Sequence, residues 1–105
     1  MEKLPRKFED ATDKYSHWLD EFTEVYDRLT KTYIAKNADY GNSFTECYKK
    51  FGKAYAYGHI WEKMKRIESL RNQDAQVKGE SIIDSLMDLA NYCILTIMEM
   101  ERLFY

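Results

Sequence analysis

Residues that interrupt helices are scarce in this sequence. Its 105 residues include one proline, Pro5, and four glycines, Gly41, Gly52, Gly58 and Gly79. Proline and glycine are the strongest breakers of regular structure, so long stretches of the chain carry no break. No repeat or low-complexity tract competes with a helical interpretation. We therefore expect the breakers to divide the chain into three long segments and one short one.

Cysteine is also rare, because the sequence contains only Cys47 and Cys93. The two residues lie in different amphipathic contexts and form no Cys-x-x-Cys pair, which argues against a disulfide framework. We expect two free thiols in a reducing cytoplasm, neither of them catalytic.

Long hydrophobic runs are absent as well. The N-terminal stretch Met1–Lys7 has no apolar signal core. No run approaches the roughly 18 apolar residues that a membrane span needs. We expect a soluble, cytoplasmic protein with no membrane partner.

Positive and negative charges are nearly balanced in the chain. Sixteen basic and eighteen acidic residues give a formal net charge of −2, which argues against nucleic acid as a general partner. A content of 45% hydrophobic and 32% charged residues is typical of one compact domain with a modest core. We expect residues 1–105 to form a single helical domain in which residues 1–7 are an N-terminal tail.

The motifs of several common enzyme classes are missing. The sequence has no P-loop, no dinucleotide fingerprint and no His-Glu-x-x-His motif. His17 and His59 have no credible nucleophile nearby in the sequence, so we expect them to be surface or packing residues.

Apolar residues spaced three and four apart predict the helices. The first helix is expected from about Lys7 to Lys36, ending in the turn Asn37–Gly41. A short amphipathic piece, a second long helix, a polar loop and a last helix follow, around Phe44–Phe51, Ile60–Leu70, Asn72–Gly79 and Ser81 to about Phe104 respectively. The pattern predicts an all-α, up-and-down bundle of three long helices and a short one.

The last helix carries an acidic stripe. A rotation of about 100° per residue places Glu80, Asp84, Asp88 and Asn91 within roughly an 80° sector. Like charges four residues apart cost roughly 0.2–0.5 kcal/mol each. The helix has no basic residue between Glu80 and Glu101 to offset them. Something outside this helix must therefore compensate the charge.

Two interpretations of the stripe remain open. In the first, Ser81 and Asp84 form a capping box, Glu80 favours the positive end of the helix dipole, and Asp88 faces water. In the second, carboxylates four residues apart share a divalent ion. Mg²⁺ characteristically takes one or two carboxylates and leaves positions for substrate phosphates and water.

The preceding helix offers partners for the stripe. Glu62 is a candidate metal ligand, and Lys63 and Arg66 are candidates for binding phosphate oxygens, Lys as a point charge and Arg with a forked grip. The alternative is an ordinary intrahelical Glu62–Arg66 ion pair on a solvated face.

Several of these residues together resemble a known family. The stretch Lys36-Asn-Ala-Asp-Tyr-Gly41, the residues Glu62-Lys63 with Arg66, and the stretches Glu80–Asp84 and Asp88-Leu-Ala-Asn-Tyr92 resemble nucleotide modification associated domain 1, a small phage and bacterial domain. That family is similar in turn to the MazG-like all-α nucleoside triphosphate pyrophosphatases. The resemblance covers roughly residues 20 to 100.

The resemblance implies a Mg²⁺-dependent enzyme that hydrolyses a nucleotide between its α and β phosphates, assembled as a dimer or tetramer. Such a protein would work in the host cytoplasm if a phage encodes it. The roles that the resemblance implies are metal binding by Glu62, Asp84 and Asp88, phosphate binding by Lys63 and Arg66, nucleoside contact by Asp39, Tyr40 and Asn91, and acceptance of the water's proton by Glu80.

The chain also departs from the MazG pattern. MazG enzymes typically carry Glu-Glu-x-x-Glu on one helix and Glu-x-x-Asp on the next, whereas this chain has Glu62-Lys63 and Asp84-x-x-x-Asp88. Whether the chain is an active enzyme is left open. The alternative is a non-catalytic phage accessory or inhibitor protein that binds a nucleotide or a host defence protein, for example as an anti-CRISPR.

The aromatic residues bear on that alternative. Nine Tyr and two Trp in 105 residues are a high load, and such rings are enriched at interfaces. Tyr15, Trp18, Tyr26 and Tyr33 fall at core spacing and are expected to pack inside the bundle or along a dimer seam. The rings interleaved with Lys49, Lys50 and Lys53, which are Tyr48, Tyr55 and Tyr57, could instead form a local contact surface for nucleic acid.

Overall fold

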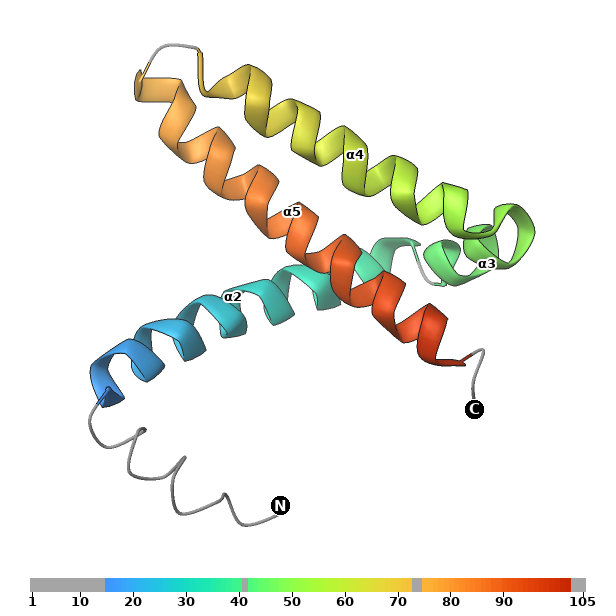
Figure 1. Cartoon of the computed structure of the whole chain (residues 1–105). Helices are drawn as coiled ribbons and strands as arrows, with labels where there is room; N and C mark the ends of the chain where they lie inside the picture. Colours follow the sequence, from blue (N-terminus) through green and yellow to red (C-terminus); the bar gives the residue numbers. More distant parts are fainter. Residues whose placement is uncertain (1–14, 41, 73–74, 103–105) are drawn as a thin grey trace. The chain divides into compact units, whose positions relative to one another are not determined.

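Every element that the structure describes is a helix. The computed structural model describes residues 15–40, 42–72 and 75–102, and the side chains at 15–38, 42–72 and 82–102. The elements are α2 (Ser16–Tyr40), α3 (Ser43–Phe51), α4 (Lys53–Leu70) and α5 (Ala75–Arg102) (Figure 1). The predicted all-α fold is confirmed for these residues.

The described residues fall into two compact units that divide between Ala35 and Lys36. The first unit holds most of α2. The second holds the last residues of α2 together with α3, α4 and α5. The prediction of one domain with a tail at residues 1–7 stays a prediction, since the tail lies outside the described residues.

Three predicted helix boundaries are wrong. The first helix was expected to stop at about Lys36, but α2 continues to Tyr40. The second long helix was expected around Ile60–Leu70, but α4 begins at Lys53. The loop expected at Asn72–Gly79 is shorter, because α5 begins at Ala75. Ser81 therefore lies inside a helix, and the predicted Ser81–Asp84 capping box, which needs a helix N-terminus, does not form. The predicted start of the first helix at Lys7 lies outside the described residues.

Two of the four glycines do not interrupt a helix. Gly58 lies within α4 and Gly79 within α5. A glycine in a helix interior costs only about 1 kcal/mol relative to alanine. Helix α4 packs along α5, and packing of this kind readily outweighs such a cost. The prediction that both glycines mark segment boundaries is wrong for that reason.

Gly52 does interrupt the chain, at the elbow between α3 and α4. Its φ is 76° and its ψ is −162°, a conformation that is essentially restricted to glycine. Its backbone N–H donates a hydrogen bond of 2.7 Å to the carbonyl of Tyr48, and its own carbonyl accepts from Tyr55 at 3.1 Å. The elbow thus ends α3 and starts α4 with no intervening loop.

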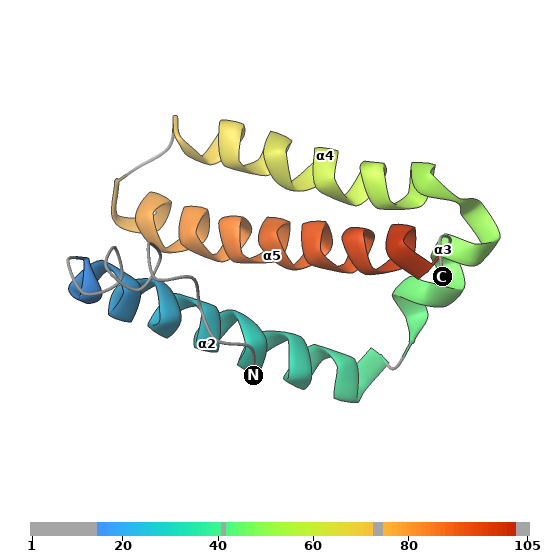
Figure 2. The ribbon, with the colours of Figure 1, turned by 60° about the horizontal axis from the view of Figure 1, so that its bottom comes forward.

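Helices α4 and α5 form an antiparallel hairpin (Figures 1 and 2). Three contacts fix their register: Arg66 with Ser85, Lys63 with Asp88, and the ring of His59 with that of Tyr92. Residues nearer the N-terminus of α4 therefore lie against residues nearer the C-terminus of α5.

Small and polar residues line the buried part of this hairpin. Ala56 is fully buried on α4, and Ser85 and Thr96 are 2% and 5% exposed on α5. Short side chains let the two helix backbones approach closely. The Thr96 hydroxyl donates a hydrogen bond to the Tyr92 carbonyl at 2.6 Å, so its burial leaves no polar group without a partner.

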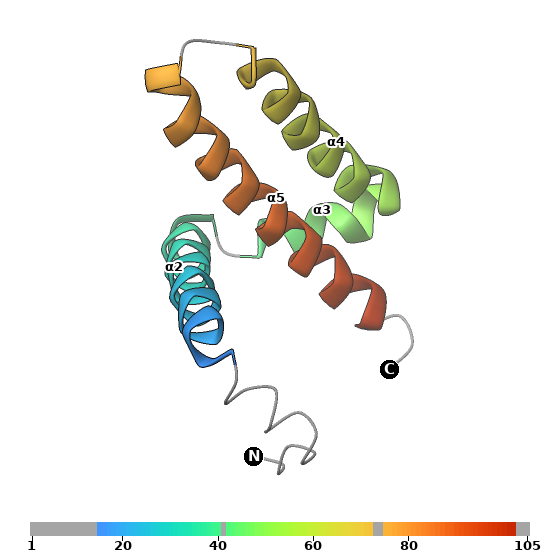
Figure 3. The ribbon, with the colours of Figure 1, turned by 60° about the vertical axis from the view of Figure 1, so that its left-hand side comes forward.

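The short helix α3 is tied to the C-terminal part of α5 (Figure 3). The Thr45 hydroxyl donates a hydrogen bond to the carboxylate of Glu99, which is only 5% exposed. Arg102 forms an ion pair with the same carboxylate and donates to Thr45 at 3.3 Å. A buried charge is tolerated when it is paired and hydrogen-bonded, and Glu99 meets both conditions.

Aromatic rings fill the space where α3, α4 and α5 meet. Phe44, Tyr55, His59 and Tyr92 lie with successive ring centroids 4.6–5.3 Å apart. Burial raises the pKa of the Tyr55 hydroxyl above its ordinary value, and the neighbouring Cys47 thiol raises it further. His59 is therefore a packing residue, as expected from the sequence.

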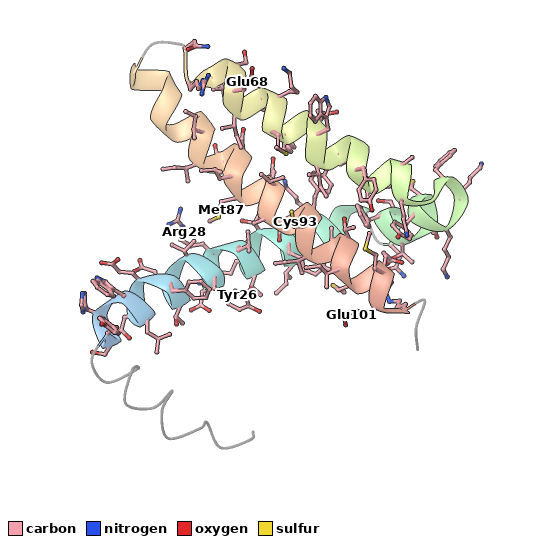
Figure 4. All side chains as sticks on the ribbon, viewed as in Figure 1. Tyr26, Arg28, Glu68, Met87, Cys93 and Glu101 are labelled. Carbon is pink, nitrogen blue, oxygen red and sulfur yellow. The ribbon has the colours of Figure 1, made fainter. Side chains whose placement is uncertain are left out.

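Both thiols are free, as expected, and half-buried. Figure 4 labels one of them, Cys93, on α5. Cys47 is part of α3.

Three of the four rings expected at core spacing are exposed, namely Tyr15, Trp18 and Tyr26, whereas Tyr33 is half-buried. Tyr15 and Trp18 stack on each other with centroids 4.8 Å apart. The exposed rings do not pack inside the bundle, and their place in a dimer seam stays a prediction. Among the described residues of this unit, Leu29 is buried. Among the described helices, none is long and apolar enough to cross a membrane.

Candidate functional site

One carboxylate, that of Asp88, joins three helices of the second unit. Lys36, near the end of α2, contacts Asp88 Oδ1 at 2.8 Å. Lys63, in the middle of α4, contacts Asp88 Oδ2 at 3.1 Å. Each carboxylate oxygen therefore binds one ammonium group. The compensating charge that the acidic stripe requires comes from outside α5, as predicted, and in this structure it consists of two lysines.

The Asp88 carboxylate is partly sheltered, with a side-chain exposure of 24%. Burial acts to raise its pKa, but hydrogen bonds from Lys36 and Lys63, together with their charges, outweigh burial and hold the pKa below its ordinary value. Asp88 is therefore ionised at neutral pH. The alternative in which Asp88 simply faces water is wrong.

Arg66 lies about one helical turn from Lys63 on α4. Its Nε donates a hydrogen bond of 3.2 Å to the hydroxyl of the buried Ser85. Among the ion pairs between described side chains, a Glu62–Arg66 pair does not occur, so the alternative of an intrahelical pair is not supported. Arg66 is exposed, and this bond uses only one of the five N–H donors of its guanidinium.

The other two predicted metal ligands, Glu62 and Asp84, are both exposed. With the register fixed by the Lys63–Asp88 and Arg66–Ser85 contacts, a rotation of 100° per residue places both on the same side of the hairpin. Among the described residues, however, no three His, Cys, Asp or Glu side chains converge closely enough to hold a metal ion.

These donors suit only one kind of Mg²⁺ site. Carboxylate oxygens are appropriate ligands for Mg²⁺, which commonly combines one or two carboxylates with substrate phosphates. The described side chains thus fit an ion that arrives with a phosphate ligand.

The predicted nucleoside contacts are only partly described. The side chains of Asp39, Tyr40 and the predicted proton acceptor Glu80 lie outside the described side chains. The Nδ2 of Asn91, three residues after Asp88, is buried and has no hydrogen-bond partner. An orphaned buried donor is costly, so this amide nitrogen is a candidate to bind a ligand acceptor.

Two of the three rings expected on the contact surface around Lys49, Lys50 and Lys53 are not available to a partner. Tyr48 is buried, and Tyr55 packs against Phe44 and His59. Only Tyr57 of the three is exposed.

Sequence reasoning missed two residues of the site. Lys36 belongs to the motif that suggested the family, but no role was assigned to it. No periodicity connects it with Asp88, because 52 positions and two intervening helices separate them. Ser85 had a weak signal, since it lies three residues before Asp88 and hence on a neighbouring part of the same helix face.

Comparison with protein families gives a match that begins at the same residue, Lys36. The family model described as nucleotide modification associated domain 1 matches residues 36–100, well over half of the chain. Searches of curated proteins and of solved structures found no match. The matched segment contains both lysines that pair with Asp88. The chain belongs to the nucleotide modification associated domain 1 family.

Proposed function

We propose that this protein binds a (deoxy)nucleoside triphosphate by its phosphates and, with Mg²⁺, hydrolyses it to a monophosphate and pyrophosphate, as MazG-like enzymes do. One observation carries the proposal. Lys36 and Lys63, from separate helices, converge on the same half-buried anion, and Arg66 lies one turn further along α4.

The three cations suit a polyphosphate. Lysine binds phosphate as a flexible point charge, and the arginine fork adds a bidentate contact. Lys63 is only 19% exposed on its side chain. A charge that is partly withdrawn from water binds an anion more strongly than one that is fully solvated. The net charge of −2 is no obstacle, since the attraction is local.

Mg²⁺ bound with the phosphates would polarise the phosphoryl oxygen and lower the pKa of the attacking water. Asp88, with Asp84 one turn before it and Glu62 on the facing helix, would hold that ion. Glu80 is the proposed acceptor of the water's proton. The nucleoside would contact Asp39, Tyr40 and Asn91, whose unpaired Nδ2 offers a hydrogen-bond donor.

A matched pair of lysine variants tests the phosphate site. Lys63→Gln removes a cation that contacts Asp88, and Lys65→Gln removes one that pairs with the exposed Glu68 on the same helix. We expect Lys63→Gln to weaken binding of a non-hydrolysable nucleoside triphosphate about tenfold, and Lys65→Gln to change it less than about twofold. Equal effects of the two variants would contradict the site.

Pyrophosphate release tests the chemistry. Wild type should release pyrophosphate from a panel of nucleoside triphosphates with Mg²⁺, and Asp88→Ala should abolish release. Absence of both nucleotide binding and release in the wild type would refute the proposed function.

One observation favours a second candidate, the non-catalytic binding protein. Glu62 and Asp84 are exposed and no three-ligand group forms among the described side chains. Fewer converging carboxylates reduce the expected metal affinity and hence turnover. Nucleotide binding without pyrophosphate release would favour a protein that sequesters a nucleotide. Absence of both nucleotide binding and pyrophosphate release would favour a host protein, such as a defence nuclease, as the partner.

We also propose assembly as a homo-oligomer. The outward faces of α4 and α5 carry exposed apolar side chains, among them Trp61, Met64, Leu86 and Ile97. Exposed apolar patches of this kind mark interaction surfaces. Light scattering coupled to size-exclusion chromatography should give at least twice the 12.6 kDa mass of the chain, and Trp61→Glu should lower that mass.

A further inference from the structure

In this structure the anion bound by the two lysines is Asp88 itself. Each of its carboxylate oxygens contacts a different ammonium group, Oδ1 that of Lys36 and Oδ2 that of Lys63. Lysines bind phosphate in the same way, with ammonium groups from separate helices contacting different oxygens of one anion. The carboxylate therefore occupies the lysines that a nucleotide phosphate would need.

We propose that Asp88 is a built-in competitor of the nucleotide phosphates, and that Lys36 is a phosphate-binding residue that exchanges Asp88 for the ligand. The inference rests on the proposed nucleotide-binding function. It predicts that the free protein binds phosphate less tightly than its lysines would allow.

The side chains differ in their freedom to move, which determines how the exchange occurs. Asp88 has a short side chain on the middle of a long helix. Lysine has a flexible four-carbon stem, and the Lys36 side chain is 54% exposed. The lysines can turn toward an incoming phosphate while Asp88 stays in place. Lys36 also lies at the start of the second unit, close to the end of α2.

Charge favours the exchange. A terminal phosphate carries about −1.5 to −2 charge at neutral pH and three acceptor oxygens. It therefore satisfies two lysines better than a carboxylate of charge −1. After the exchange, both oxygens of Asp88 have lost their lysines and can accept other donors or a cation.

Binding of inorganic pyrophosphate, measured by calorimetry in EDTA, tests this inference without any metal ion. Asp88→Asn removes the competitor's charge and keeps its shape. Glu101→Gln removes the same charge from the same helix, at an exposed residue outside the proposed site and without an ion pair among the described side chains. We expect Asp88→Asn to bind pyrophosphate about tenfold more tightly than wild type, and Glu101→Gln to differ less than about twofold.

Lys36 provides a second arm of the experiment. Lys36→Gln should weaken pyrophosphate binding about tenfold, whereas Lys31→Gln, which removes a charge from the same helix five residues earlier, should change it less than about twofold. Helicity by circular dichroism checks that each variant is folded. If Asp88→Asn is not folded, Asp88→Ser, which also removes the charge, takes its place in the comparison.

The outcomes separate this inference from the proposed function. Tighter binding by Asp88→Asn alone supports the competitor. Binding by wild type with no gain in Asp88→Asn, or an equal gain in Glu101→Gln, overturns the competitor and leaves the proposed function standing. If neither wild type nor Asp88→Asn binds pyrophosphate or a nucleotide, with or without Mg²⁺, the proposed function fails and the inference fails with it.

Discussion

Thr45 and Glu99 are 54 residues apart in the sequence, and the Thr45 hydroxyl donates a hydrogen bond of 2.6 Å to the Glu99 carboxylate. This bond connects α3 to the C-terminal part of α5. Since Glu99 is buried, its carboxylate depends on Thr45 and Arg102 for the hydrogen bonds that water would otherwise supply.

Replacing Thr45 with valine keeps the shape of the side chain and removes the donor. We expect Thr45→Val to lower the free energy of unfolding by about 1.5–3 kcal/mol, the range for a lost hydrogen bond to a charged group. Thr30→Val is the control, because the exposed Thr30 hydroxyl bonds only the Tyr26 carbonyl of its own helix. Urea unfolding measures both variants, and equal losses would contradict the role assigned to Thr45.

Two glycines six residues apart should respond to alanine in opposite directions. Gly52→Ala forces a side chain into a positive-φ conformation and should cost about 1–3 kcal/mol of stability. Gly58 lies in α4, where an added Cβ meets no atom within 4 Å, so Gly58→Ala should stabilise the protein by about 0.4–1 kcal/mol. Thermal unfolding of the two variants gives the signs, and a stabilising Gly52→Ala would refute the elbow conformation.

The interface between α4 and α5 should not tolerate a larger residue at position 56. Ala56 has no exposed surface, and Ala54, on the same helix, is exposed. We expect Ala56→Leu to destabilise the protein by about 1–3 kcal/mol through overpacking, and Ala54→Leu to change stability by less than about 0.5 kcal/mol. Unfolding midpoints in urea would measure both. A neutral Ala56→Leu would mean that α4 and α5 are less closely packed than described.

The helices could be predicted from the sequence, but some of their ends could not. Apolar residues three and four apart identify a helix because they lie on one face, whatever the rest of the chain does. A boundary depends on a balance of about 1 kcal/mol, which packing easily reverses. For this reason Gly58 and Gly79 lie inside helices, while Gly52 marks a real break because it also adopts a positive φ.

The candidate site was predictable on one helix and unpredictable between helices. The lack of basic residues on α5 showed that the charge of Asp88 needs a partner from elsewhere. Which residue supplies it depends on which side chains of the second unit come to lie beside α5, and sequence periodicity contains no information on such distant contacts. Lys63 was identified only as a phosphate ligand, and Lys36 was assigned no role, although both bind Asp88.

The Asp88 clamp, which consists of the ion pairs of the Asp88 carboxylate with Lys36 and Lys63, should also make the free energy of unfolding depend on pH in the acid range. The folded pKa of Asp88 lies below its ordinary value of 3.8, so the ionised clamp stabilises the folded state above about that pH, and the contribution is lost as the pH falls through the folded pKa. We expect Asp88→Asn to lower stability by about 1 kcal/mol at pH 7, since the clamp is partly exposed, and the difference from wild type to shrink steadily below pH 4. Asp84→Asn, the control, should stay within about 0.5 kcal/mol of wild type at both pH values. Urea unfolding at pH 7 and pH 3 measures the differences, and a loss in Asp88→Asn that is as large at pH 3 as at pH 7 would show that the carboxylate charge does not contribute.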